Sequence, residues 1–144
     1  NDVIKVNNHI KDNYVNEQEL KIEIHKLINK ITSFEKLKEV KKELEDRFGT
    51  IDRDMYIYMN EELFTNLAKE KGVIEINDNN MYIEIVFDKE KSNSIDYGNL
   101  FLITSNISNK FKLEYKTDKL YIKLLKNTLS KHYLLYLNEL LEKM

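Results

Sequence analysis

The sequence lacks cysteine, proline and tryptophan altogether, and it has only three glycines among its 144 residues. Without cysteine the chain offers no thiol nucleophile, no thiolate metal ligand and no disulfide, a composition that suits a reducing compartment. The glycines, at positions 49, 72 and 98, lie 23 and 26 residues apart, so no glycine-rich loop can form locally to cradle a phosphate. We therefore expect no ATP hydrolysis by this chain and no bound cofactor.

Long apolar runs and an excess of one charge are missing as well. No uninterrupted apolar run is longer than five residues, which is short even for a strand, whereas a membrane-spanning helix needs roughly 20. No signal-peptide pattern opens the sequence. With 23 basic and 25 acidic residues, the chain has no overall field to attract nucleic acid. We expect a soluble, cytoplasmic domain without membrane contact, excised from a longer protein because Asn1 is no initiator residue.

No combination of residues predicts a catalytic site. The three histidines, His9, His25 and His132, lack the paired spacing of a metal site. No serine lies in a nucleophile motif such as G-x-S-x-G, and the many carboxylates show no spacing that would separate an acid from a base. The sequence therefore predicts no catalytic, cofactor-binding or metal-binding residue, and we expect the chain not to be an enzyme.

The most informative stretch runs from Ser33 to Gly49 and is typical of one complete helix. Thr32, followed three residues later by Glu35, fits a capping box at its start, and Gly49 supplies the residue type that commonly closes a helix. Apolar residues recur along it at steps of three and four, namely Phe34, Leu37, Val40, Leu44 and Phe48. We expect this stripe, including Phe48, to be buried against the neighbouring helices.

The C-terminal end of this helix is rich in acids. Glu43, Glu45 and Asp46 stand where the helix macrodipole already places negative partial charge, so each is unfavourable by about 0.3–1 kcal/mol if exposed. Two explanations are open at this point. Either neighbouring cations neutralise the acids, or a basic partner does; the candidate cations are Lys41, Lys42 and Arg47.

Apolar periodicity predicts two further helices in the N-terminal half. The first covers about residues 17–31, with Asn16 as its N-cap. The other covers about residues 53–71, with Asp52 as its cap and Gly72 at its end. Ahead of them, Val3 to Val6 form a strand candidate, and residues 1–13 are a possible strand and connector from a preceding domain.

From Val73 onward the apolar period becomes alternating. Residues 73–76 and 81–87 flank a run of turn-forming residues and predict a hairpin, which is followed by a polar loop over 88–94. A helix over about 96–107, a second hairpin turning at Thr117-Asp118, and a final helix over about 128–143 complete the chain. The predicted fold class is α+β. It consists of three N-terminal helices packed with antiparallel β-hairpins and two further helices, in a single domain over residues 1–144.

The run ELEDRFG at residues 43–49, with a helix before it and a third helix ending at Gly72 after it, carries a resemblance to a known family. It is similar to the C-terminal domain of bacterial transcription-repair coupling factors, whose pattern there is close to E-L-x-D-R-F-G. The order of the remaining elements also suits that domain. This chain departs from the family at the start of its first helix, where Tyr-Ile-Pro or Phe-Ile-Pro reads Tyr14-Val15-Asn16, and where Arg-Leu-x-x-Tyr reads as Lys21 to His25.

The resemblance implies a non-catalytic regulatory domain of a DNA translocase that links stalled RNA polymerase to nucleotide excision repair. Such a domain docks on the N-terminal UvrB-like module of the same protein and masks the surface that would recruit UvrA. The family pattern extends to Glu43, Asp46 and Arg47, so these residues are the expected partner-binding site.

Two other functions stay in view. The Lys110–Lys126 segment interleaves lysines with aromatic residues, as a sheet that binds nucleic acid can do, and it makes a nucleic-acid-contacting module the alternative. The same pattern is typical of the solvated face of a lysine-rich protein, so we expect no direct nucleic-acid contact. A small enzyme is the third and least favoured possibility.

Overall fold

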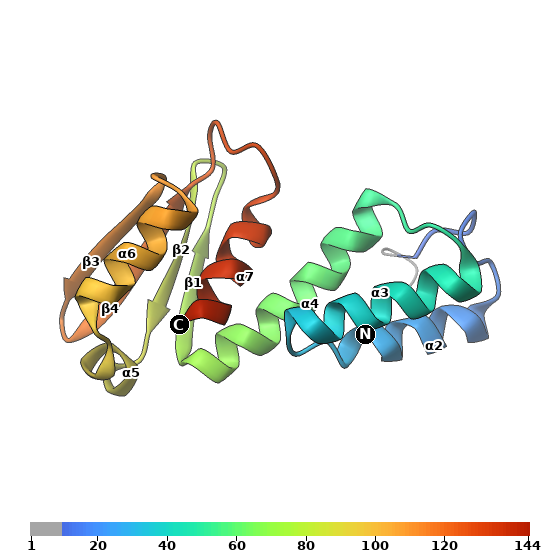
Figure 1. Ribbon diagram of the computed structural model, residues 1–144, viewed down its shortest axis with the longest axis horizontal. Helices are drawn as coiled ribbons and strands as arrows, with labels where there is room; N and C mark the ends of the chain where they lie inside the picture. Colours follow the sequence, from blue (N-terminus) through green and yellow to red (C-terminus); the bar gives the residue numbers. More distant parts are fainter. Residues whose placement is uncertain (1–9) are drawn as a thin grey trace. The chain divides into compact units, whose positions relative to one another are not determined.

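The computed structural model describes residues 10–144, so the strand predicted at Val3–Val6, His9 and most of the 1–13 connector lie outside the described residues. Within the described part the chain forms six helices and a four-stranded antiparallel sheet (Figure 1). The predicted α+β class, with three helices ahead of two hairpins, is therefore confirmed. Contacts gather into two compact units, the first ending at Asn66 and the second beginning at Leu67. That residues 1–144 act as one regulatory domain stays a prediction.

The first unit contains α2 (Gln18–Asn29), α3 (Phe34–Phe48) and most of α4 (Arg53–Lys71). The start of α2 differs from the prediction, because its N-cap is Glu17 rather than Asn16 and no side chain caps it. Its end also comes earlier than residue 31. Lys30 and Ile31 donate their backbone N–H groups to carbonyls three residues back, which tightens the last turn and ends the α-helix.

Helix α3 lies where the sequence places it, but with a different cap. Ser33, not Thr32, is the N-cap, and its hydroxyl accepts a hydrogen bond from the Lys36 N–H at 3.0 Å. Gly49 closes the helix with a φ of 97°, a backbone conformation that a side chain would disfavour. Three members of the apolar stripe are fully buried, Leu37, Val40 and Leu44, and they pack into a core with residues of α2 such as Ile24 and Ile28.

Helix α4 has the bounds that the sequence predicts. The Asp52 carboxylate accepts from the Met55 N–H at 2.8 Å and so replaces the proline that often starts a helix. Gly72, with a φ of 88°, ends the helix. A Cβ at this position would lie 3.1 Å from both the Asp88 carboxylate and the Lys91 Cβ, so the close approach also requires glycine.

The second unit is built on the sheet, whose strand order is β1-β2-β4-β3. Its strands are β1 (Val73–Asp78), β2 (Tyr82–Phe87), β3 (Phe111–Lys116) and β4 (Lys119–Leu125). Both predicted hairpins are confirmed, and Thr117 and Asp118 turn the second one with positive φ angles. The central pair β2 and β4 sets Ile83 against Leu124 and Ile85 against Ile122 on the buried face.

Three helices complete the second unit: α5 (Lys89–Ser94), α6 (Tyr97–Ile107) and α7 (Tyr133–Lys143). Helix α6 contacts β3 and α7 (Figure 1). The prediction of a polar loop over 88–94 is wrong, because the Asp88 carboxylate caps a short helix by accepting from the Lys91 N–H at 2.7 Å. The last helix begins at 133 rather than near 128, since Thr128 has a φ of 65°, which a right-handed helix cannot contain.

Candidate functional site

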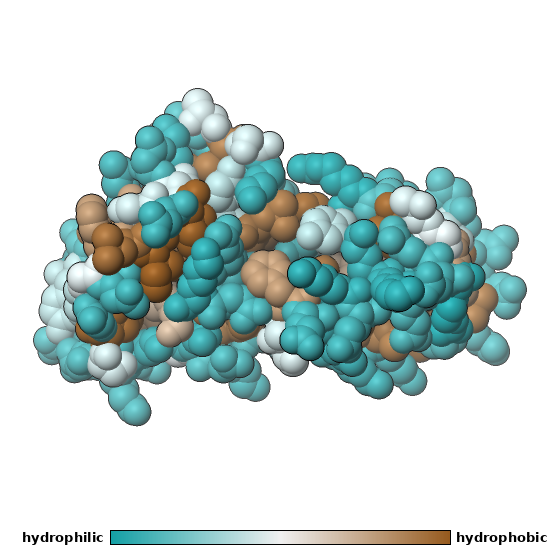
Figure 2. Space-filling view, viewed as in Figure 1, coloured by the Kyte–Doolittle hydropathy of each residue, from teal (hydrophilic) through white to brown (hydrophobic). Residues whose placement is uncertain are grey.

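The acidic end of α3 is neutralised within its own helix. Each of its three acids forms an ion pair with a cation four residues away: Lys41 with Glu45 at 3.3 Å, Lys42 with Asp46 at 3.0 Å and Arg47 with Glu43 at 3.4 Å. Of the two explanations that the sequence left open, neighbouring cations are therefore present where they are needed. Figure 2 shows hydrophilic side chains over this helix. The acids do not require a partner for the domain to fold.

Arg47 also joins α3 to α2. Its guanidinium lies 2.8 Å from the Glu23 carboxylate, closer than the 3.4 Å that separates it from Glu43. The hydrogen bond from Arg47 lowers the pKa of Glu23, and the bond to Glu23 is the main cause that raises the pKa of Arg47. Arg47 is thus first a structural residue. The sequence does not identify Glu23 as a partner of Arg47, because the spacing of residues on two separate helices does not show that they meet.

Phe48 is half-buried, so the expectation that it lies in the core is wrong. It stands in the last turn of α3, where the Arg47 guanidinium lies 4.8 Å from its ring centre and the Tyr14 ring meets it edge-on at 6.2 Å. The Tyr14 hydroxyl lies within hydrogen-bond distance of two carbonyl oxygens, those of Leu44 at 3.1 Å and Gly49 at 2.9 Å. Burial, followed by the charge of Glu45, raises the pKa of Tyr14. Tyr14 and Phe48 therefore pack together at the C-terminal end of α3, where Tyr14 also satisfies backbone carbonyl groups.

The three acids differ in how exposed they are and in whether they bond to the backbone. The Glu45 side chain is 29% exposed, and besides Lys41 it accepts a hydrogen bond from the Ile51 N–H at 3.2 Å, which supports the chain after Gly49. Glu43 and Asp46 are 48% and 65% exposed and accept no hydrogen bond from the backbone of residues 10–144. The structure therefore brings Glu43 and Arg47 together, turns Asp46 toward Lys42, and leaves both predicted acids accessible from outside.

The lysine-rich hairpin of β3 and β4 is less basic than its sequence suggests. Lys116 lies 3.3 Å from Glu114, and Lys126 lies 2.5 Å from Asp78. Two lysines also cover tyrosine rings, Lys116 over Tyr121 and Lys123 over Tyr82. Bases could stack on those rings only if the lysines moved away. Two of the six lysines of this segment are thus paired with acids, whereas Lys112 and Tyr115 stay exposed.

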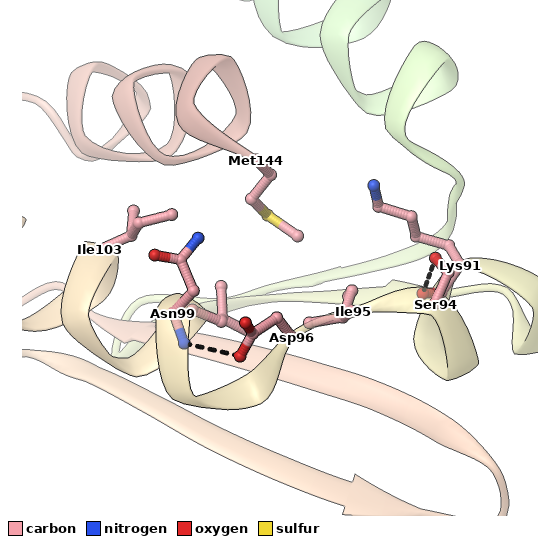
Figure 3. A pocket seen from close by; sticks show the side chains of 8 residues that line it. Lys91, Ser94, Ile95, Asp96, Asn99, Ile103 and Met144 are labelled. Atoms are coloured by element: carbon pink, nitrogen blue, oxygen red, sulfur yellow. Dashed lines mark hydrogen bonds between the residues drawn. The ribbon is translucent and has the colours of Figure 1, made fainter.

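A pocket of about 210 Å³ lies in the second unit beside α6 (Figure 3). Two of its polar side chains bond to the fold: Asp96 accepts from the Asn99 N–H at 3.1 Å, and the Ser94 hydroxyl donates to the Lys91 carbonyl oxygen at 2.9 Å. Ile103 and Met144 supply apolar lining. No nucleophile with an adjacent base lies in this pocket. Among residues 10–144 no three His, Asp or Glu side chains gather as metal ligands.

Comparison with known proteins places the sequence in a family. The model of the TRCF domain matches residues 4–100, a range that contains α2, α3, α4, the first hairpin and the acidic run. The chain belongs to the TRCF domain family. No curated protein matches the sequence. Among the solved structures, one described as the C-terminal domain of transcription-repair coupling factor matches with a TM-score of 0.74 and 21% identity, over 93% of this chain and 83% of that chain.

The two comparisons agree on what the chain is at the level of the fold. The structural match extends the likeness in fold beyond residue 100, since it covers 93% of the chain. The resemblance that the ELEDRFG run predicts is thus confirmed. No helix in the described residues has both the length and the apolar composition that crossing a bilayer would need.

Proposed function

We propose that this TRCF domain is the C-terminal regulatory domain of a transcription-repair coupling factor, a DNA translocase that acts between stalled RNA polymerase and nucleotide excision repair. In this role it docks on the N-terminal UvrB-like module of the same protein and masks the surface that recruits UvrA. The observation that carries the proposal is the family match over a range that includes Glu43, Asp46 and Arg47. The domain itself is not an enzyme, and the translocase motor belongs to the parent protein.

Docking through Asp46 requires only the exchange of one ion pair for another. The Lys42–Asp46 pair is exposed on both sides, 78% and 65%, and exposed pairs contribute only about 0.2–1 kcal/mol. Its direction is also the weaker one, because the cation precedes the acid along the helix. An arginine of the UvrB-like module can therefore take Asp46 from Lys42 at little cost.

Glu43 can exchange its partner without leaving a charge unpaired. When Glu43 turns toward the UvrB-like module, Arg47 keeps its shorter contact with Glu23. The two helices stay joined, and the guanidinium stays close to the docking surface. Arg47 thus positions the site, while Glu43 and Asp46 supply the charges that meet the partner.

The test uses the full-length coupling factor that carries this domain. Glu43→Lys with Asp46→Lys should weaken docking of the domain on the UvrB-like module. The surface that recruits UvrA then becomes accessible, so the affinity of the full-length protein for UvrA should rise. The matched control is Glu61→Lys with Glu70→Lys, which changes the net charge by the same amount at two exposed positions of α4. Circular dichroism of both variants of the isolated chain checks that the domain remains folded. An affinity for UvrA equal to that of the wild type would contradict the site assignment.

A further inference from the structure

A second surface of the first unit is hollowed into a groove. A groove of about 580 Å³ runs between α3 and the start of α4. Its lining combines apolar and basic side chains, chiefly Leu37, Lys38, Lys41, Ile51, Arg53 and Tyr56. In an α-helix, residues 38 and 41 face a different side from residues 43 and 46. The groove is therefore separate from the acidic surface that carries the proposed docking function.

The floor of the groove is apolar and fixed. Leu37 and Ile51 are core residues, 2% and 9% exposed, whose outer edges the groove reaches. Tyr56 is half-buried beside them and presents an aromatic ring. Such a floor can bury one or two apolar side chains of a ligand without rearranging the core.

The acidic and basic side chains around the floor differ in whether they already have partners. Both acids that line the groove are already engaged, Glu45 with Lys41 and the Ile51 N–H, and Asp52 with the Met55 N–H at 2.8 Å and Lys11 at 3.2 Å. Two cations are not engaged in this way. Lys38 and Arg53 are exposed and form no ion pair or side-chain hydrogen bond within residues 10–144. To a ligand, the groove offers free positive charge over an apolar floor.

We propose that this groove binds an acidic protein segment, which inserts an apolar side chain over Leu37 and Ile51 and directs carboxylates toward Lys38 and Arg53. Charge complementarity selects the acids, and the apolar floor selects a peptide over a phosphate backbone. Single-stranded nucleic acid is held by a track of cations with exposed aromatic rings on which bases stack, and this groove has two free cations and one half-buried ring. The groove would give the domain a second partner with the opposite charge preference to the acidic end of α3.

The experiment is an NMR titration of the ¹⁵N-labelled 144-residue chain with a capped peptide, Ser-Glu-Asp-Leu-Phe-Asp-Glu-Ser. Amide signals of residues along the groove, such as Lys38, Ile51 and Arg53, should shift in a saturable way. Three probes serve as controls: the peptide with lysine in place of every acid, the peptide with serine in place of Leu-Phe, and an oligothymidylate of similar length. All three should bind at least about tenfold more weakly than the acidic apolar peptide.

Variants of the chain locate the binding. Lys38→Glu with Arg53→Glu should weaken binding of the acidic peptide by about tenfold or more. The matched control, Lys89→Glu with Lys112→Glu, reverses two exposed lysines of the second unit and should leave the affinity unchanged. Failure of the acidic peptide to shift the groove signals would overturn the proposal, as would equal binding by the Lys38→Glu, Arg53→Glu variant. Tighter binding of the oligothymidylate at the same residues would overturn it in favour of a nucleic-acid site. None of these outcomes depends on UvrA or on docking through Glu43 and Asp46.

Discussion

Arg47 of α3 and Glu23 of α2 lie 2.8 Å apart and form an ion pair between two helices of the first unit. The pair lowers the pKa of Glu23 below its ordinary value of 4.5. A carboxylate with a lowered pKa in the folded state contributes stability above its unfolded-state pKa, and this contribution is lost as the pH falls through the folded-state pKa. The pair therefore adds to the acid sensitivity of the domain.

We predict that Glu23→Gln makes the free energy of unfolding less dependent on pH below about 4.5, where the Glu23 carboxylate of the wild type takes up its proton. At neutral pH the variant should be slightly less stable than the wild type, and at the acid end the two should converge. Urea unfolding at a series of pH values measures this. Glu19→Gln, at an exposed position of the same helix, is the control and should keep the wild-type slope. An unchanged slope for Glu23→Gln would show that the pair is not held in solution.

Phe48 tests the energetic consequence of partial burial. Removing a fully buried phenylalanine costs about 3–5 kcal/mol, but Phe48 is half-buried, so Phe48→Ala should cost only about 1–2 kcal/mol of the free energy of unfolding. Leu44→Ala, one turn earlier and fully buried, should cost more, about 2–5 kcal/mol. Urea denaturation of the two variants side by side makes the comparison. A larger loss for Phe48→Ala than for Leu44→Ala would contradict the assignment of the core.

Ser92 is a buried polar residue that holds the second unit together. Its hydroxyl donates to the Asp88 carbonyl oxygen at 2.7 Å and accepts from the Leu120 N–H at 2.8 Å. Ser92→Ala leaves that buried N–H without its acceptor, so the variant should lose about 1–3 kcal/mol of the free energy of unfolding. Ser94→Ala removes an exposed hydroxyl of the same short helix and should change stability by less than about 0.5 kcal/mol. Thermal melts of both variants measure the difference. An equal loss of stability in the two variants would contradict the structural role assigned to the Ser92 hydroxyl.

The elements with strong periodicity and clear caps could be predicted from the sequence. Helix α4, both hairpins and the positive φ at Gly49 follow from local patterns that the tertiary structure does not override. Two wrong predictions, the polar loop over 88–94 and the start of the last helix, have local causes as well. Asp88 caps a helix in a stretch too polar to show an apolar stripe, and Thr128 adopts a left-handed conformation that composition does not reveal.

The residues of the candidate site could be predicted from the sequence, but their partners on other helices could not. The sequence identifies the acids and names Lys42 and Arg47 as possible counter-ions, since these lie four residues away on one helix. It does not identify Glu23 or the free cations Lys38 and Arg53. Those depend on how α2, α3 and α4 pack together, and on which of several nearby acids each cation contacts.

The spacing of the glycines leads to a prediction about nucleotides. Because no phosphate-cradling loop can form, the chain should neither bind ATP nor release phosphate from it. Isothermal titration calorimetry and a phosphate-release assay on the 144-residue chain would measure this directly. Saturable binding at micromolar concentration would require a nucleotide site of a kind that neither the sequence nor the described pockets contain.

The last prediction separates the structural acid of α3 from the proposed docking acid. Glu45 accepts from the Ile51 N–H and pairs with Lys41, so Glu45→Ala should lower the free energy of unfolding by about 1 kcal/mol. It should leave the affinity of the full-length coupling factor for UvrA unchanged, because Glu45 lies on the groove side of α3 and not on the acidic surface formed by Glu43 and Asp46. Asp46→Lys should raise the affinity for UvrA and leave the free energy of unfolding nearly unchanged, since Asp46 is 65% exposed and pairs with Lys42.

Measuring both quantities for both variants distinguishes docking from general loosening of the domain. If Glu45→Ala raised UvrA affinity as much as Asp46→Lys, loss of stability alone would explain the release, and the role of Asp46 as a docking residue would be lost. If only Asp46→Lys raised it, the exposed acid would act through its charge. Asp46→Asn then refines the result, because it removes the charge while keeping the size of the side chain. It should give a smaller effect in the same direction as the charge reversal.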